Sequence, residues 1–299
     1  RIAEGLEAQR RQRVEQQARR REEERLRVVG QPPLDVAETF KDRQRDLQKL
    51  GQLLAEPTTR LVSVIGHGGM GKTALACKVL QDLERHRWPY TEEKMPVDGI
   101  VYLSTRTAGI SLERLFLDCA KLLGGEEQER LTAVWTNPQI ETQEKIVRLL
   151  QSLSDGRYVI LLDNLEDLLY DQGRLADDDL RLFFDRVLTT ACGAQLMVTS
   201  RVALAFRREV MRFDRQVKLL EGLPTNDGVA LLRELDPNGD YSLRDAPQEQ
   251  LADAADLAHG VPRALEVLAG ILANDPFTTL DEVVETFYEQ EDVVRALIE

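Results

Sequence analysis

The sequence predicts an α/β fold in which a parallel sheet is covered by helices and followed by a small all-α helical domain. From Phe40 onward, short β-type runs alternate with longer helical patterns, as expected for parallel strands joined by crossover helices. After about Val217 the strand signals stop, and only helical patterns follow. We therefore expect a charged helix over residues 1–29, an α/β domain over 30–214 and a helical domain over 215–299.

Strands and helices are predicted from the spacing of apolar residues. The run at Tyr158 is almost wholly apolar, as expected for a central strand covered on both faces. Asn137 before Pro138 predicts a helix cap followed by a first-turn proline. The expected strands are Leu61–Ile65, Ile100–Leu103, Tyr158–Leu162 and Gln195–Thr199. The expected helices are Gly71–Leu83, Ser111–Leu123, Pro138–Leu153, Asp177–Leu188, Gly228–Leu235, Pro247–Leu257, Pro262–Leu272 and Leu280–Tyr288.

The N-terminal segment differs in charge from the rest of the chain. The first 28 residues hold nine Arg and six Glu, a balance of +3, whereas the remaining 271 residues have a balance of −16. Acid-to-base pairs four residues apart, such as Glu7 with Arg11 and Glu15 with Arg19, favour a helix. Because apolar residues are sparse there, an exposed connecting helix is favoured over a nucleic-acid-binding arm. Gly30 and the prolines after it end the helix.

Bulk composition narrows the class of protein. The net charge of −13 argues against direct nucleic-acid binding, and no apolar run approaches the roughly 18 residues of a membrane span. The three cysteines, Cys77, Cys119 and Cys192, have no spacing that suits a metal site or a disulfide framework, so we expect buried thiols in the cytoplasm. The chain begins at Arg1 without a signal peptide, and we expect it to be a piece of a longer protein.

A phosphate-binding loop (P-loop) is predicted between the first strand and the helix after it. Its glycines let successive backbone N–H groups point at phosphate oxygens, and the helix start adds its positive dipole end. Lys72 would bridge the terminal phosphates, and the Thr73 hydroxyl would bind Mg²⁺. The full motif spacing and the preceding strand favour this over a glycine-rich turn without ligand. The expected binding residues are Gly66, Gly68, Gly69, Met70, Gly71, Lys72, Thr73 and Ala74.

A second magnesium-binding residue is expected at the end of a neighbouring buried strand. Asp163 follows five apolar residues, so its carboxylate belongs at the carboxyl edge of the sheet, where α/β folds bind ligands. The alternative is a capping role for the next helix. Asn164, directly after it, is neutral and cannot act as a base, which predicts slow hydrolysis. Glu166 or Asp167 could substitute for the missing acid only if the chain bends, because a position two or three residues later otherwise points elsewhere.

Beyond the P-loop, the sequence resembles the signal-transduction ATPases with numerous domains, of the NB-ARC type. Residues 40–43, Phe-Lys-Asp-Arg, look like the family segment that contacts adenine, with Arg43 at its arginine and Asp42 where glycine is usual. Residues 260–265, Gly-Val-Pro-Arg-Ala-Leu, resemble a motif of the helical domain whose proline, here Pro262, contacts adenine. The strand at 195–199 runs into Ser200 and Arg201, similar to a sensor strand whose arginine faces the γ-phosphate.

The resemblance implies an ATP/ADP-binding switch that uses Mg²⁺. ADP would hold a closed form and ATP would permit an open form that self-associates as a homo-oligomer. The implied catalytic residues are Lys72, Asp163, Asn164 and Arg201. An N-terminal effector domain and C-terminal sensor domains are expected as partners in the same protein. An immune-type sensor, a transcriptional regulator and, less favoured, a catalytic NTPase or kinase acting on a small substrate remain open at this point.

Overall fold

The computed structural model describes residues 27–33, 40, 43–56, 58–85, 87, 97–275 and 277–289. Most of the expected N-terminal helix, residues 1–26, lies outside the described residues, as do Lys41 and Asp42. The last part of that helix is wrong, because Arg27–Val29 forms a short strand, β1, which pairs in parallel with β3. Among the described residues, none of the helices is both long and apolar enough to cross a membrane.

The core of the molecule is a six-stranded sheet in the order β1-β3-β4-β7-β2-β8, with every pair parallel. All four expected strands are present. The edge strand β8 was missed, and it extends the sheet past the predicted boundary between residues 214 and 215. The strands besides β1 are β2 (Leu61–Gly66), β3 (Gly99–Ser104), β4 (Tyr158–Asp163), β7 (Ala194–Ser200) and β8 (Asp214–Leu219).

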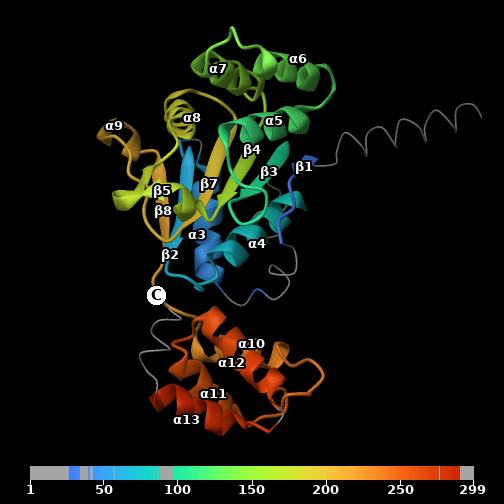
Figure 1. Ribbon diagram of the computed structural model, residues 1–299, viewed down its shortest axis with the longest axis vertical. Coiled ribbons are helices and arrows are strands. Elements are labelled where there is room, and N and C mark those ends of the chain that lie inside the picture. Colours follow the sequence, from blue (N-terminus) through green and yellow to red (C-terminus); the bar gives the residue numbers. More distant parts are fainter. Residues whose placement is uncertain are drawn as a thin grey trace, which may run out of the picture.

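Helices cover both faces of the sheet, and four more form the helical domain, drawn in orange to red in Figure 1. The helices of the α/β domain are α3 (Gln44–Ala55), α4 (Lys72–Glu84), α5 (Leu112–Leu123), α6 (Gly125–Thr136), α7 (Thr142–Ser152), α8 (Asp178–Thr189) and the short α9 (Arg208–Met211). Of these, α6 and α7 pack on α5 and α8 and lie farther from the sheet (Figure 1). The helical domain holds α10 (Thr225–Glu234), α11 (Gln248–Leu257), α12 (Pro262–Asn274) and α13 (Leu280–Glu289).

Two predicted helix starts are wrong by three residues or more. The helix expected to begin at Gly228 begins at Thr225. The expected helix Pro138–Leu153 begins instead at Thr142, and α6 before it was not predicted. The side chain of Asn137 accepts a hydrogen bond from the backbone N–H of Gln139 at 2.9 Å, so it forms a local turn rather than a helix cap. By contrast, α12 begins at Pro262, with its proline in the first turn as expected.

Two buried clusters lie on the two faces of the sheet. Successive strand residues alternate between them: Ile100 and Tyr102 belong to one cluster, and Val101 and Leu103 to the other. The first cluster includes α3 and α4 and continues into the helical domain, whereas the second is covered by α5 to α8. The helical domain therefore shares buried apolar contacts with one side of the α/β domain. The three cysteines are buried free thiols, as expected.

Candidate nucleotide-binding site

The P-loop lies between β2 and α4, as the sequence predicted. Gly69 and Gly71 have φ angles of +73° and +83°, a backbone conformation that favours glycine. Lys72 is the first residue of α4 and is 7% exposed. Its Nζ donates to the carbonyl oxygens of Gly66 at 2.7 Å and His67 at 2.8 Å, which holds the ammonium group beneath the loop. Burial lowers the pKa of Lys72, and the charge of Glu166 opposes that shift.

Asp163 ends β4 and is 1% exposed. Its Oδ1 accepts hydrogen bonds from the hydroxyls of Thr73, at 2.9 Å, and Thr199, and its Oδ2 accepts one from the Tyr102 hydroxyl at 3.2 Å. Burial and the neighbouring carboxylate raise the pKa of Tyr102, so its hydroxyl keeps its proton. Thr73 and Asp163, the predicted metal ligands, are therefore in direct contact. Asp163 was expected at the end of a strand next to the P-loop strand, β2. This detail is wrong, because β7 lies between β2 and β4 in the sheet.

The chain bends sharply after Asp163. Asn164 has a left-handed backbone with φ of 59°, and its N–H donates to Thr199 Oγ1 at 2.9 Å. A short 3₁₀ helix, η1 (Leu165–Leu168), follows and returns Glu166 to the pocket. Glu166 was expected to point elsewhere unless the chain bends, and the chain does bend here, so Glu166 lies in the pocket. Asp167 does point away: it is exposed and accepts from the Thr105 hydroxyl at 2.6 Å.

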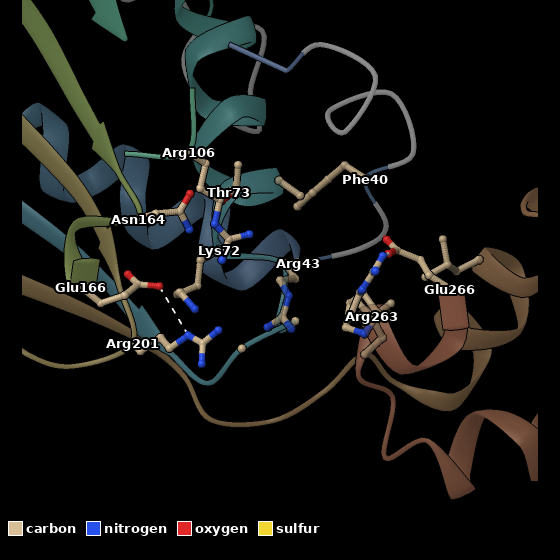
Figure 2. Close-up of a pocket in the computed structure, with 17 residues that line it drawn as sticks. Phe40, Arg43, Lys72, Thr73, Arg106, Asn164, Glu166, Arg201, Arg263 and Glu266 are labelled. Carbon is tan, nitrogen blue, oxygen red and sulfur yellow. Dashed lines mark hydrogen bonds and ion pairs between the residues drawn. The ribbon is translucent and has the colours of Figure 1, made fainter. Parts of the chain in front are cut away.

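Arg201 follows the carboxyl end of β7 and lies over the P-loop. Its Nε is 3.5 Å from Glu166 Oε1, and its side chain is 47% exposed. A Cβ placed on Gly68 would lie 3.3 Å from the guanidinium carbon, so the arginine is next to the loop backbone. Figure 2 shows Arg201 and Lys72 on the same side of the pocket, with Glu166 turned toward them.

The helical domain approaches the P-loop through the start of α12. The backbone N–H of Arg263 donates to the Gly69 carbonyl at 3.3 Å. Pro262 lies 3.8 Å from the position a Cβ on Gly71 would take. This contact brings one predicted adenine-side residue, Pro262, next to the predicted phosphate loop.

Arg43 also connects the P-loop with the segment that leads into the helical domain. Its Nη2 donates to the carbonyls of Met70 at 3.0 Å and Glu221 at 3.3 Å, and its Nη1 pairs with Asp46 at 3.4 Å. Burial lowers the pKa of Arg43, and Asp46 opposes that shift. Met70 itself is 3% exposed and packs in the core, so it offers only backbone groups to the loop.

A cavity of about 270 Å³ lies between these groups (Figure 2). Most predicted site residues line it; Gly66, Met70 and Asp163 do not, and they support the loop and Thr73 from behind. The predicted residues in its lining are Arg43, Gly68, Gly69, Gly71, Lys72, Thr73, Ala74, Asn164, Arg201 and Pro262. The lining also includes residues that the sequence did not predict as binding or catalytic groups: Phe40, Arg106, Glu166, Leu223, Leu231, Arg263 and Glu266. Arg106 follows the carboxyl end of β3, and that position is a signal by which it could have been found.

The donor set fits Mg²⁺ bound together with phosphate. Mg²⁺ usually takes one or two protein oxygens and completes its shell with phosphate oxygens and water. Thr73 and Asp163 offer a hydroxyl and a carboxylate. The described part of the chain holds no group of three or more His, Cys, Asp or Glu residues that could hold a metal ion. The pair is thus suited to a metal that arrives with a phosphate ligand.

The sequence model of the NB-ARC domain family matches residues 43–201, just over half of the chain. The chain therefore belongs to the NB-ARC family of P-loop nucleotide-binding domains. An uncharacterised WD repeat-containing protein of Nostoc sp. strain PCC 7120 is 29% identical over 140 residues, which are 47% of this chain. The matched region spans only 10% of that relative's length.

Solved structures share the fold at low sequence identity. The Walker-type ATPase PABY2304 of Pyrococcus abyssi has a TM-score of 0.54 and 16% identity, covering 87% of this chain and 74% of that one. The Aeropyrum pernix Orc1 protein, solved in complex with DNA, has a TM-score of 0.51 and 20% identity, covering 86% of this chain and 67% of that one. These similarities confirm the predicted fold class, an α/β P-loop domain followed by helices.

Proposed function

We propose that this chain is an ATP/ADP-binding switch module of a larger signalling or immune-type protein. The observation that carries the proposal is one cavity walled by two domains, with Lys72 and Thr73 on one side and Pro262 and Arg263 on the other. A nucleotide in that cavity would contact both walls. Its chemical identity could then influence how the two domains are arranged.

The phosphate wall supplies the groups that ATP and ADP require. The loop glycines expose backbone N–H groups, Lys72 supplies a positive charge, and Thr73 with Asp163 would hold Mg²⁺. Bound Mg²⁺ would neutralise phosphate charge and polarise the phosphoryl oxygens. Arg201, beside Gly68 of the loop, is the candidate group for the γ-phosphate that distinguishes ATP from ADP.

Hydrolysis is expected to be slow. Asn164, directly after the metal-binding carboxylate, offers a neutral amide that cannot accept a proton from water. The Glu166 carboxylate is paired with Arg201 in this conformation. A switch must keep its bound nucleotide for a long time, and slow hydrolysis allows this.

The wider assembly is also a proposal. The Nostoc relative carries WD repeats and is about ten times longer than its matched region. We infer that this chain works beside N-terminal effector and C-terminal sensor domains in the cytoplasm, and that ATP promotes self-association into a homo-oligomer. The relative's repeats favour a sensor protein of this kind over an isolated metabolic enzyme.

Calorimetry and turnover together test the proposal. Titration with ATP and ADP, with and without Mg²⁺, should show tight binding of both nucleotides, and purified protein should retain nucleotide after gel filtration. Turnover should be far slower than the roughly 10 s⁻¹ of a typical enzyme. Absence of binding to either nucleotide, or rapid multiple turnover with free product release, would contradict a switch.

A further inference from the structure

Three cationic side chains line the phosphate side of the cavity: Lys72, Arg106 and Arg201. Burial has the largest effect on the pKa of Lys72 and lowers it, and repulsion from Arg201 and Arg106 lowers it further. The three groups are therefore close enough to repel one another, and Figure 2 shows Lys72 between the two arginines. A ligand with several negative charges, such as the terminal phosphates of ATP, would relieve this repulsion.

The two arginines differ in their contacts. Arg201 Nε is 3.5 Å from Glu166 Oε1, and its guanidinium group lies against Gly68 of the P-loop. The Arg106 side chain is exposed, and no acidic side chain in the part of the chain that the structure describes forms an ion pair with it. The charge of Arg106 is thus available to a ligand in the cavity.

The turn that carries Arg106 is held in place by hydrogen bonds to the turn after β4. The Thr105 N–H donates to the Asp163 carbonyl at 3.3 Å, and the Thr105 hydroxyl donates to Asp167 at 2.6 Å. The Arg106 N–H donates to Ser104 Oγ at 3.3 Å. The backbone of Arg106 is therefore fixed at the carboxyl edge of β3, from which its side chain enters the cavity.

We propose that Arg106 is a catalytic residue that stabilises the negative charge of the γ-phosphoryl group during ATP hydrolysis. This inference rests on the proposed function. The water oxygen forms a bond to the γ-phosphorus while the bond from that phosphorus to the β,γ-bridging oxygen breaks. The electron pair of the broken bond leaves with ADP, and the proton lost by water passes to the released phosphate. Arg106 donates hydrogen bonds to the γ-phosphoryl oxygens from the β3 side, while Arg201 approaches from the Gly68 side.

The exposure of Arg106 suits a group that acts mainly in the transition state. Ordering a long exposed side chain costs conformational entropy, so it adds little to the binding of the ground state. Hydrogen bonds to charge that develops during the reaction raise the rate instead. An arginine supplies no base, and P-loop enzymes with such an arginine in the same chain can still turn over at only about 0.01 s⁻¹. Slow hydrolysis and a catalytic Arg106 are therefore compatible.

The test compares Arg106→Ala with Arg174→Ala in the full chain. Both substitutions remove one exposed positive charge, and Arg174, in the short strand β6 (Arg174–Leu175), does not line the cavity. Single-turnover release of γ-phosphate from radiolabelled ATP should fall by about 100-fold or more in Arg106→Ala and by less than about twofold in Arg174→Ala. Calorimetry should find the affinities for ATP and ADP within about threefold of native in both variants.

ADP with aluminium fluoride and Mg²⁺ imitates the γ-phosphoryl group in the transition state and gives a measurement that needs no turnover. Aluminium fluoride should tighten ADP binding to the native chain and to Arg174→Ala by about 100-fold or more. About tenfold or more of that gain should be lost in Arg106→Ala. Arg106→Lys keeps the charge without the planar guanidinium group and should recover part of the gain.

Each other outcome has a defined meaning. Native behaviour of Arg106→Ala, a loss in only one of the two measurements, or equal losses in Arg174→Ala would overturn the assignment. An equal loss of ATP and ADP affinity in Arg106→Ala would also overturn it, because Arg106 would then be a general phosphate-binding residue.

A native chain that binds ATP with Mg²⁺ but neither hydrolyses it nor responds to aluminium fluoride would likewise overturn the assignment. A native chain that binds no nucleotide would instead refute the proposed function. If Arg106→Ala does not fold by circular dichroism, Arg106→Gln keeps a polar side chain and replaces it, with the same losses expected. Native behaviour of Arg106→Gln would then overturn the proposal.

Discussion

The two walls of the nucleotide cavity are built in different ways. The phosphate wall rests on buried side chains, with Lys72 and Asp163 7% and 1% exposed and bonded within the α/β domain. The helical wall meets it through a few hydrogen bonds and through an apolar cluster. Arg263 N–H donates to the Gly69 carbonyl, the Arg43 side chain bridges the carbonyls of Met70 and Glu221, and the buried cluster on the α4 side of the sheet continues into the helical domain.

This difference indicates that the two walls have different roles in nucleotide binding. A wall of buried, mutually bonded groups suits tight and constant binding of phosphates, because it is preorganised before the ligand arrives. A wall joined by a few hydrogen bonds and by apolar contacts, which have no fixed direction, can change its position, which suits a part that responds to the ligand. Substitutions in the first wall should abolish binding, and substitutions at the junction should weaken coupling.

The largest expected effect is at Lys72. Lys72→Ala removes the charge that would offset two phosphates, and affinity for both ATP and ADP should fall by about 100-fold or more. Calorimetry measures this, with circular dichroism to check that the fold is intact. Lys78→Ala, on the same helix but paired with Asp82, is the matched control and should bind normally. Equal affinity in native and Lys72→Ala protein would remove Lys72 from the site.

Asp163→Ala should chiefly affect the magnesium-dependent part of binding. The native chain should bind ATP more tightly with Mg²⁺ than with a chelator, and the variant should lose about tenfold or more of that difference. The hydroxyls of Thr73, Thr199 and Tyr102 would also lose their acceptor, so a lower Tm is expected. If affinity falls equally with and without Mg²⁺, Asp163 is not the metal ligand.

At the junction, Arg43→Ala should have a smaller effect on affinity and a clear effect on coupling. It removes the hydrogen bonds to Met70 and Glu221. Nucleotide affinity should fall by about five- to tenfold, as expected for one or two lost hydrogen bonds. Limited proteolysis between β8 and α10 should become faster, while Arg45→Ala, an exposed neighbour, should behave as native. Unchanged proteolysis in Arg43→Ala would show that the bridge does not couple the domains.

The smallest effect is expected at Tyr102. Tyr102→Phe removes one of three hydroxyl donors to Asp163, and the free energy of unfolding should fall by about 1 kcal/mol. Chemical denaturation measures this, with the exposed Tyr170→Phe as control. Binding of ATP with Mg²⁺ should change little, because Thr73 and Thr199 still hold the carboxylate. A large loss of magnesium-dependent binding would mean that Tyr102 is essential for the metal site.

The sequence predicted the strands with continuous apolar runs but missed those at the edges. β8, Asp214–Leu219, begins with three polar residues and has a neighbour on one side only, so its apolar signal is too short to predict a strand. β1 has three residues within a segment whose charge pattern favours a helix. Neither can be recognised without the partner strand that supplies its hydrogen bonds.

Within the site, the motif residues were predictable from the sequence, but the residues that contact them from other strands and turns were not. Lys72, Thr73 and Asp163 occur in local patterns whose spacing determines their geometry. Tyr102 and Thr199 reach Asp163 from other strands, and Glu166 reaches the cavity only because Asn164 adopts a left-handed conformation. Such contacts depend on tertiary arrangement and on single backbone angles, which apolar periodicity does not report.

The central claim is that the identity of the nucleotide sets the arrangement of the two domains. Small-angle scattering of the native chain with Mg²⁺ and either ADP or a non-hydrolysable ATP analogue tests this most directly, with Arg201→Ala measured beside it. The γ-phosphate is the chemical difference between the ligands, and a charge-assisted hydrogen bond to Arg201 of about 1.5 to 3 kcal/mol would change the population ratio by about tenfold or more. We expect different scattering profiles for the two nucleotides in the native chain, and identical profiles in Arg201→Ala with ADP affinity preserved. Identical profiles in the native chain would contradict the account.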